Sequence, residues 1–384
     1  EVALALMLLI GAGLLMRSLA RVLTVAPGFD PAHLLTMQIQ TSGPRFDNDT
    51  ITRAFFDRAL ESVRRVPGVE SAAFVSQLPL SSDFDMSGVH LESRPWANPG
   101  QDPSAFRYAV SPGYIATMRI PVLRGRAFTE QDRAGEPAVV LINATLARHE
   151  WPGQDPIGQR IRIGSATDGP WRTVVGIVGD VKQTSLTAEQ PDAVYVPESQ
   201  WPYADGWLSL VVRSHGDPAA LAPALRRTIW SVDKDQAIVR VATMDALIAS
   251  SAAQRRFAFL LFEMFSVTAL ILAAAGIYGV LAGTVTERLR EIGVRLALGA
   301  SRWDILSMVL RQGLGLTAFG IILGAGGALA LRRIIAGLLF GVSSVDPLTY
   351  VGVTGVLAVA ALAACWVPAM RATRVDPAVT LRAE

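Results

Sequence analysis

The chain has 384 residues, of which 51% are hydrophobic and 18% are charged, and its formal net charge at pH 7 is +2. This balanced charge argues against nucleic-acid binding, which depends on an excess of Lys and Arg. A single cysteine, Cys365, excludes a disulfide within the chain. Long apolar runs at both ends, with a long polar segment between them, predict a protein that is partly embedded in a lipid bilayer.

Four apolar segments can each form a membrane-spanning helix, which needs about 20 apolar residues. They lie at 1–24, 264–285, 313–331 and 348–370. The continuous apolar run of the first ends at Met16, before Arg17. Either the amphipathic residues up to Leu23 complete this span, or the chain begins partway through a longer polypeptide. A cleaved signal peptide is the rival explanation, although no basic residues precede the run and no clean cleavage site follows it.

Residues 25–255 are expected to form an extracytoplasmic α+β domain that is inserted between the first two spans. The order strand, helix, strand occurs at both of its ends: 34–40, 51–66 and 71–76, then 207–213, 218–232 and 237–241. Two such units predict one subdomain built from both ends, with its helices on one face of a sheet. The middle, about 80–202, predicts an inserted second subdomain of short strands. A helix over 244–256 is expected to form a stalk that leads into the second span.

The segment 287–302, between the second and third spans, carries the strongest signal. It is too highly charged to lie in lipid, so it forms a loop at one membrane face. Arginines in and beside it indicate the cytoplasmic face: Arg288, Arg290, Arg295, Arg302 and Arg311. The tail agrees, with Arg371, Arg374 and Arg382, whereas Arg332 and Arg333 fall on the outer side.

An apolar stripe with helical spacing runs along this loop: Leu289, Ile292 and Leu296. Glu291 and Arg295 are four residues apart, in the orientation that favours an ion pair on a helix. Gly299 suits a helix C-terminus, and Ser301 with Asp304 forms a capping box that begins the next helix. These residues are equally consistent with an interfacial helix on lipid headgroups and with a docking element for a cytoplasmic protein.

Two spans carry glycines at the spacing that lets helices approach closely. They are Gly276, Gly279 and Gly283 in the second span, and Gly320 and Gly324 in the third. Contacts within one copy and contacts with a second copy are both consistent with this spacing. Glu263 stands at the outer start of the second span. A carboxylate there is a functional candidate, although at the headgroup boundary it can simply reach water.

Catalysis, a metal site and a cofactor find no support in the sequence. The histidines lack metal-ligand spacing: His33, His90, His149 and His215. The Ser- and Asp-rich run 80–85 fits a solvated loop. Neither Lys182 nor Lys234 follows a glycine, so the chain has no phosphate-binding loop of the Gly-x-x-x-x-Gly-Lys-[Ser/Thr] type. We therefore expect no enzymatic activity of its own.

Several motifs resemble the MacB/FtsX-type permeases of ABC transporters. The sequence from Arg290 to Ser301 (REIGVRLALGAS) resembles the cytoplasmic loop of that family. Segments similar to its periplasmic domain are 110–114, 123–128, 151–158 and 175–180. Segments 17–30, 275–280 and 371–377 resemble the exit of the first span, the second span and the tail. The motifs are closest to the large permeases that carry this unit twice, of which this chain would be the C-terminal half.

This resemblance implies a bacterial cytoplasmic (inner) membrane, four spans with a periplasmic domain between the first two, and a dimer or pseudo-dimer of permeases. Two cytoplasmic ATPase subunits would dock under the loop between the second and third spans. The coupling residues would be Arg290, Glu291, Ile292, Arg295, Leu296, Gly299 and Ser301. ATP hydrolysis by the partner would then drive motion of the periplasmic domain for export or extrusion of a substrate.

Two alternatives stay open. A permease of this type can act as a transmembrane signal relay that controls a periplasmic partner without transport. The chain could also be a membrane-tethered periplasmic binding protein with no ATPase partner. The sequence does not name a substrate, so drug, lipid, lipoprotein and peptide are all consistent with it.

Overall fold

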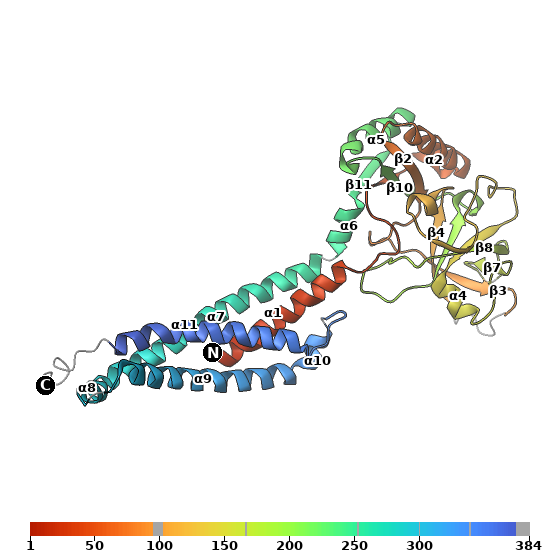
Figure 1. The fold of residues 1–384 in the computed structure, drawn as a ribbon. Coiled ribbons are helices and arrows are strands. Elements are labelled where there is room, and N and C mark those ends of the chain that lie inside the picture. The colour runs from red at the N-terminus through yellow and green to blue at the C-terminus, as the bar shows by residue number, and fades with distance from the viewer. Residues whose placement is uncertain (95–102, 166, 252, 299, 338, 374–384) are drawn as a thin grey trace. The chain divides into compact units, whose positions relative to one another are not determined.

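The computed structural model describes residues 1–94, 103–165, 167–251, 253–298, 300–337 and 339–373. It divides the chain into two compact units, one of residues 1–24 and 253–384 and the other of residues 25–252. The first unit is helical (Figure 1). Its helices are α1 (Val2–Leu23), α7 (Ala253–Glu287), α8 (Leu289–Ala297), α9 (Arg302–Ala330), α10 (Arg332–Ala336) and α11 (Pro347–Ala372). The tail arginines Arg374 and Arg382 lie outside the described residues.

Four of these helices are long and apolar enough to cross a membrane, which confirms the four predicted spans. The apolar stretches lie at 2–23, 256–287, 303–330 and 347–372. Helix α9 begins at Arg302, well before the predicted span 313–331, because the cap at Ser301 starts it in the polar loop. Within the unit, α1 packs against α7, α9 and α11 around an apolar core that includes Leu6, Ile10 and Leu357.

The second unit is an α+β fold. Its strands are β1 (Leu34–Gln40), β2 (Val69–Val75), β3 (Met86–Leu91), β4 (Ser104–Val110), β5 (Val122–Gly125), β6 (Val139–Asn143), β7 (Arg160–Ile163), β8 (Arg172–Val178), β9 (Ala193–Pro197), β10 (Trp207–Ser214) and β11 (Ala237–Thr243). Its α-helices are α2 (Asp49–Arg64), α3 (Tyr114–Thr117), α4 (Ala144–Glu150), α5 (Pro218–Val232) and α6 (Met244–Ser251). Two 3-10 turns, Pro44–Asp47 and Glu198–Gln200, complete it.

Strands from the two ends of this unit interleave. The sheet begins in the order β11-β1-β10-β2, and each neighbouring pair is antiparallel. In this register Leu34 pairs with Arg213 and Leu35 pairs with Thr243. The entry and the exit of the unit therefore lie side by side. Helices α2 and α5 cover one face of these strands, with Phe55 among the buried residues they share with the sheet (Figure 1).

The remaining strands extend the same sheet. A single register pair, Val75 with Val110, joins β2 to β4, and the order continues β3-β7-β8-β6-β9 with β5 beside β8. The pairs β4–β9 and β6–β8 are parallel. Because the described strands form one connected sheet, a separate subdomain over residues 80–202 stays a prediction. The described residues of the helix expected over 244–256 are helical, with α6 ending at Ser251 and α7 beginning at Ala253, and residue 252 lies outside the described ones.

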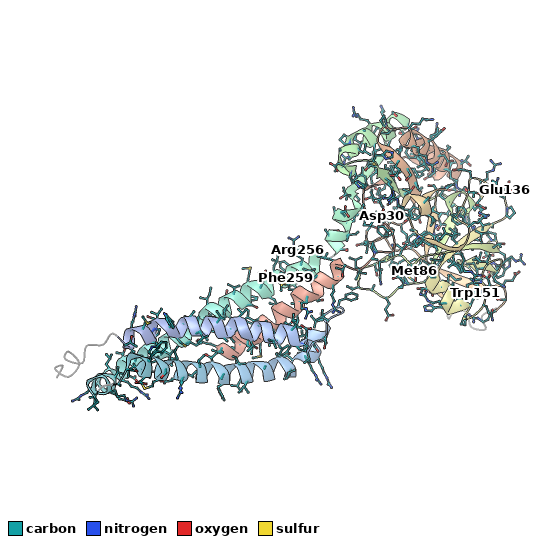
Figure 2. The ribbon with its side chains drawn as sticks, in the orientation of Figure 1. Asp30, Met86, Glu136, Trp151, Arg256 and Phe259 are labelled. Atoms are coloured by element: carbon teal, nitrogen blue, oxygen red, sulfur yellow. The ribbon has the colours of Figure 1, made fainter. Side chains whose placement is uncertain are left out.

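A buried arginine ties together the segments at the entry of this unit. Arg213 on β10 is 1% exposed. It donates hydrogen bonds to the backbone oxygens of Thr117, Ala32 and Asp30 at 2.9, 2.6 and 2.9 Å. Its guanidinium also lies 3.4 Å from a carboxylate oxygen of Asp30, which Figure 2 labels. A buried guanidinium is stable only when its donors are satisfied, so these contacts fix where the segment before β1 lies.

A partly buried ion pair lies where α2 meets the 3-10 turn at Glu198–Gln200. Arg53 on α2 donates to the backbone oxygen of Trp201 at 2.7 Å and reaches a carboxylate oxygen of Glu198 at 3.4 Å. Burial nevertheless raises the pKa of Glu198 from 4.5 to about 7. Burial also raises the pKa of the neighbouring Asp57 on α2. Negative charge is therefore costly at this junction.

Replacing Glu198 by Gln should stabilise the protein at high pH and not at low pH. The folded state binds a proton at Glu198 more tightly than the unfolded chain, because the pKa is about 7 rather than 4.5. The wild type therefore loses stability as pH rises from 4.5 through 7, by about 3 kcal/mol in total. We expect Glu198→Gln to raise the Tm of the purified chain in detergent at pH 8, and the difference to close towards pH 5.

The matched control is Glu61→Gln, which changes an exposed carboxylate on the same helix as Arg53. Its Tm should follow that of the wild type at every pH. A Glu198→Gln effect of equal size at pH 5 and pH 8 would rule out the ionisation of this carboxylate as its cause.

Candidate functional site

The loop between α7 and α9 contains a short helix of its own. Helix α8 begins at Leu289, two residues after α7 ends at Glu287. At the start of α9, the backbone N–H of Asp304 donates to Ser301 Oγ at 3.3 Å, and that of Ser301 donates to an Asp304 carboxylate oxygen at 2.9 Å. This reciprocal pair is the expected capping box. Gly299 lies outside the described residues.

The apolar side of α8 faces other helices. Ile292 is 1% exposed and belongs to a core that includes Val285, Ile305 and Val309. Leu289 packs partly against the same core, and the side chain of Leu296 lies outside the described ones. At Ile292, therefore, the stripe is buried in protein rather than resting on lipid headgroups. Burying such a side chain contributes about 2 kcal/mol, and packing of this kind, more than intrinsic propensity, stabilises so short a helix.

The charged side chains of α8 are exposed. Arg290, Glu291 and Arg295 are exposed, and the last two form the predicted ion pair. The Arg295 guanidinium also lies 3.0 Å from the sulfur of Met308 on α9. An exposed pair at this spacing adds only about 0.3–0.5 kcal/mol to the helix. The charges are thus free to contribute to a contact with another molecule.

Two large apolar side chains flank these charges. Leu298 is 83% exposed at the end of α8, and Trp303 is 73% exposed in the first turn of α9. Together, Arg290, Glu291, Arg295, Leu298 and Trp303 form what we call the α8 surface. Sequence reasoning missed Trp303, because tryptophan is also the residue expected where a span meets the headgroups.

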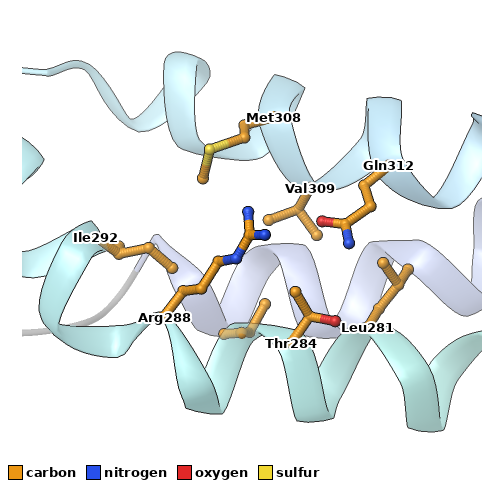
Figure 3. Close-up of a pocket in the computed structure, with 8 residues that line it drawn as sticks. Leu281, Thr284, Arg288, Ile292, Met308, Val309 and Gln312 are labelled. Carbon is orange, nitrogen blue, oxygen red and sulfur yellow. The ribbon is translucent and has the colours of Figure 1, made fainter.

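A small cavity lies between the end of α7 and α9, with Ile292 of α8 at its edge (Figure 3). Its volume is about 10 Å³, which leaves room for about one water molecule. Figure 3 shows the Arg288 guanidinium directed from the end of α7 towards α9, near Met308 and Gln312. No nucleotide or drug-sized ligand fits here. The chemistry of this region is therefore that of an exposed surface and not that of a pocket.

The glycines of the two spans divide into two groups. A Cβ atom at Gly320 or Gly324 would lie 2.6–2.8 Å from atoms of Val2 and Ala3, so these glycines allow α9 to approach α1. Gly276 similarly faces the side chain of Glu1. Around Gly279 and Gly283, in contrast, a Cβ would meet no described atom within 4 Å. Packing within the chain accounts for the first three glycines and not for the last two.

Glu263 is exposed on α7, and a role for it stays a prediction.

A valine at position 324 should loosen the contact between α9 and α1. The added Cβ would lie 2.8 Å from a backbone oxygen and 2.9 Å from Leu6, which cannot both yield without a helix shift. Overpacking of this kind costs about 1–3 kcal/mol. We expect Gly324→Val to lower the Tm of the purified chain in detergent, whereas Gly326→Val, on the same helix with open space around it, should not. Equal Tm values for the two variants would refute this packing role.

Comparison with known proteins identifies the class. Residues 2–229 match the model of the MacB-like periplasmic core domain, which is more than half of the chain. Residues 263–377 match the model of the FtsX-like permease C-terminal domain. The chain is therefore a membrane permease whose soluble unit is a domain of the periplasmic MacB type. It belongs to the MacB/FtsX-type permeases of ABC transporters.

Two relatives illustrate the range of this family. The chain is 27% identical over 252 residues to the macrolide export ATP-binding/permease protein MacB of Marinobacter nauticus, covering 62% of this chain and 37% of that protein. It is 28% identical over 284 residues to the pyoverdine export ATP-binding/permease protein PvdT of Pseudomonas putida, covering 69% of this chain and 41% of that protein. The chain thus spans less than half the length of these relatives.

Solved structures of similar domains are more distant. The periplasmic region of MacB from Actinobacillus actinomycetemcomitans is 15% identical with a TM-score of 0.39, over 60% of this chain and 97% of that one. The extracellular domain of the noncanonic ABC-type transporter YknZ from Gram-positive bacteria is 14% identical with a TM-score of 0.36, over 54% of this chain and 100% of that one.

Proposed function

We propose that this chain couples ATP hydrolysis by a separate cytoplasmic ATPase subunit to motion of its periplasmic unit, for export or extrusion of a substrate across the envelope. The chain would lie in a bacterial inner membrane, paired with a second permease copy. The observation that carries the proposal is the two-sided helix α8, which is buried on one side and exposes charged and large apolar side chains on the other.

The buried side of α8 provides a path for force. Ile292 packs in one core with Val285 near the end of α7 and with Ile305 on α9. Because packed interiors deform little, a displacement of α8 moves both neighbouring helices with it. Helix α7 then continues without a break for 35 residues, back to Ala253. A push on α8 can therefore travel along α7 to the segment that joins the periplasmic unit.

The exposed side of α8 provides a surface that a protein partner can bind. Trp, Tyr and Arg are enriched in the energetically dominant centres of protein interfaces, and the α8 surface exposes Trp303, Arg290 and Arg295. Each of these arginines also presents donors that a carboxylate can accept in pairs. The surface thus fits an acidic, grooved partner surface, which the ATPase subunit would supply.

Neither alternative is removed by this proposal. A signal relay would use the same α8 surface and differ only in what the periplasmic unit does. A tethered binding protein would leave the α8 surface without a partner. Purification of the full chain from membranes in mild detergent tests the last alternative. An ATPase should co-purify with a coupled transporter or a signal relay, and not with a tethered binding protein.

Exchanging the charges on α8 separates docking from helix stability. Glu291→Arg and Arg295→Glu each break the intrahelical pair, whereas the double exchange restores it in the reverse order. If the charges meet the ATPase, all three variants should bind it at least about tenfold more weakly and lose stimulation of its ATP hydrolysis. The measurement is ATP turnover by the co-purifying ATPase, with equal amounts of each permease variant reconstituted in lipid.

The control is Arg333→Glu, which reverses an exposed arginine on α10 and should leave ATP turnover unchanged. Full recovery of ATPase stimulation in the double exchange would show that Glu291 and Arg295 serve only their own helix. That outcome would remove the docking role of these two residues.

A further inference from the structure

The periplasmic unit contains a cleft that is separate from the α8 surface. Its volume is about 700 Å³, within the range of pockets that hold drug-sized molecules. The residues that line it come from the end of β2, the loop 82–85, strand β4 and the loop before β10. Met86, labelled in Figure 2, begins β3 directly after this loop. Sequence analysis assigned residues 80–85 to a solvated loop, but the structure places part of them in the wall of the cleft.

Three aromatic side chains of the lining are exposed. They are Phe84 at 69%, Trp207 at 54% and Tyr203 at 50%. An exposed Trp or Phe on a soluble surface leaves apolar area in contact with water, and several of them in one concave site indicate a ligand with an apolar body. Each ring also carries a negative π-face that attracts a cation.

The charges of the lining have an excess of carboxylates. Arg107, which is buried, is shared between Asp85 and Asp205. A third carboxylate, Asp83, pairs at 2.6 Å with the exposed Arg240. The lining itself thus holds three carboxylates and one guanidinium group, and Arg240 pairs with Asp83 from outside it. Arg53 also acts on Asp205 from outside the lining, but it is itself paired with Glu198, whose pKa burial raises to about 7. With both outside pairs counted, the ionised carboxylates exceed the guanidinium groups by one. Burial raises the pKa of Asp205 although Arg107 lowers it, so additional positive charge at this site would be favourable.

The wall of the cleft is held in one conformation before any ligand arrives. The side chain of Gln77 donates to the backbone oxygens of Asp85 and Arg107 at 3.1 and 2.8 Å, and it accepts from the Asp85 N–H at 2.9 Å. Ser82 adopts a φ of 69°, a left-handed conformation that costs energy outside glycine. These contacts present Phe84 to solvent without the ordering cost that a mobile loop would add.

We propose that this cleft binds a monocationic amphipathic small molecule, with the cation near Asp85 and Asp205 and the apolar body against Phe84, Tyr203 and Trp207. This inference rests on the proposed function only where it takes the bound molecule to be a substrate of the periplasmic unit. An anion would be repelled by the excess carboxylate. A neutral apolar molecule would leave that charge uncompensated.

The test is direct binding to the full chain in nanodiscs of phosphatidylcholine, which carries no net charge. Rhodamine 6G serves as the amphipathic cation and fluorescein as an anion of similar size, each followed by fluorescence anisotropy at low salt. Empty nanodiscs give the background from lipid. Neither nucleotide nor ATPase is present, so failure here leaves the coupling proposal intact, and failure of the charge-exchange experiment leaves this one intact.

We expect saturable binding of rhodamine 6G, and none of fluorescein. The double variant Phe84→Ala/Trp207→Ala should bind rhodamine 6G about tenfold or more weakly than the wild type. Leu123→Ala, which changes an exposed apolar residue outside the cleft, should leave this affinity unchanged. Asp205→Asn should also weaken binding. Arg240→Gln, which frees Asp83, should tighten it several-fold.

The opposite signs of the last two variants distinguish charge from damage to the fold. Unfolding would weaken binding in both, and Tm values identify a variant that has lost its structure. Absence of saturable binding to the wild type, equal binding by the double aromatic variant, or equal binding of fluorescein would each overturn the proposal.

Discussion

The pairing of β1 with β10 and β11 is the constraint on which the soluble unit depends. It joins residues near position 35 to residues near 213 and 243, so the two ends of the unit lie side by side. Closing so long a segment costs little more conformational entropy than closing a shorter one, because this cost grows only with the logarithm of the segment length. Arg213 reinforces the closure from within the sheet. The chain therefore enters and leaves this unit at neighbouring strands of one sheet.

The two proposed sites have one feature in common, which is that well-packed residues support the exposed ones. Helix α8 buries Ile292 and presents Arg290, Glu291 and Arg295. The loop at the cleft is fixed by Gln77 and presents Phe84. In each case the packed contacts hold the exposed groups in place before binding, which reduces the entropic cost of association. Coupling and ligand binding would thus use preformed surfaces, and motion would involve whole helices.

Much of the membrane unit could be predicted because its signals are local. Apolar runs of sufficient length predict spans, and the four-residue spacing of Glu291 and Arg295 predicts their pairing on one helix turn. Ser301 and Asp304 predict a helix start through hydrogen bonds that reach only three residues. Helix α7 begins before the apolar run of the second span, in agreement with the stalk helix that the sequence predicts over 244–256.

By itself, the sequence determined the membrane class, the four spans, the short helix α8 and the resemblance to a permease family, since each depends on neighbouring residues or on motifs. Only the tertiary structure decided which glycines contact another helix and which face open space. The same is true of the cleft, where Phe84 and Trp207 stand more than 100 residues apart in the chain and share a wall through the sheet order. No local sequence pattern predicts that these two residues line one cleft, because the pairing of distant strands brings their side chains together.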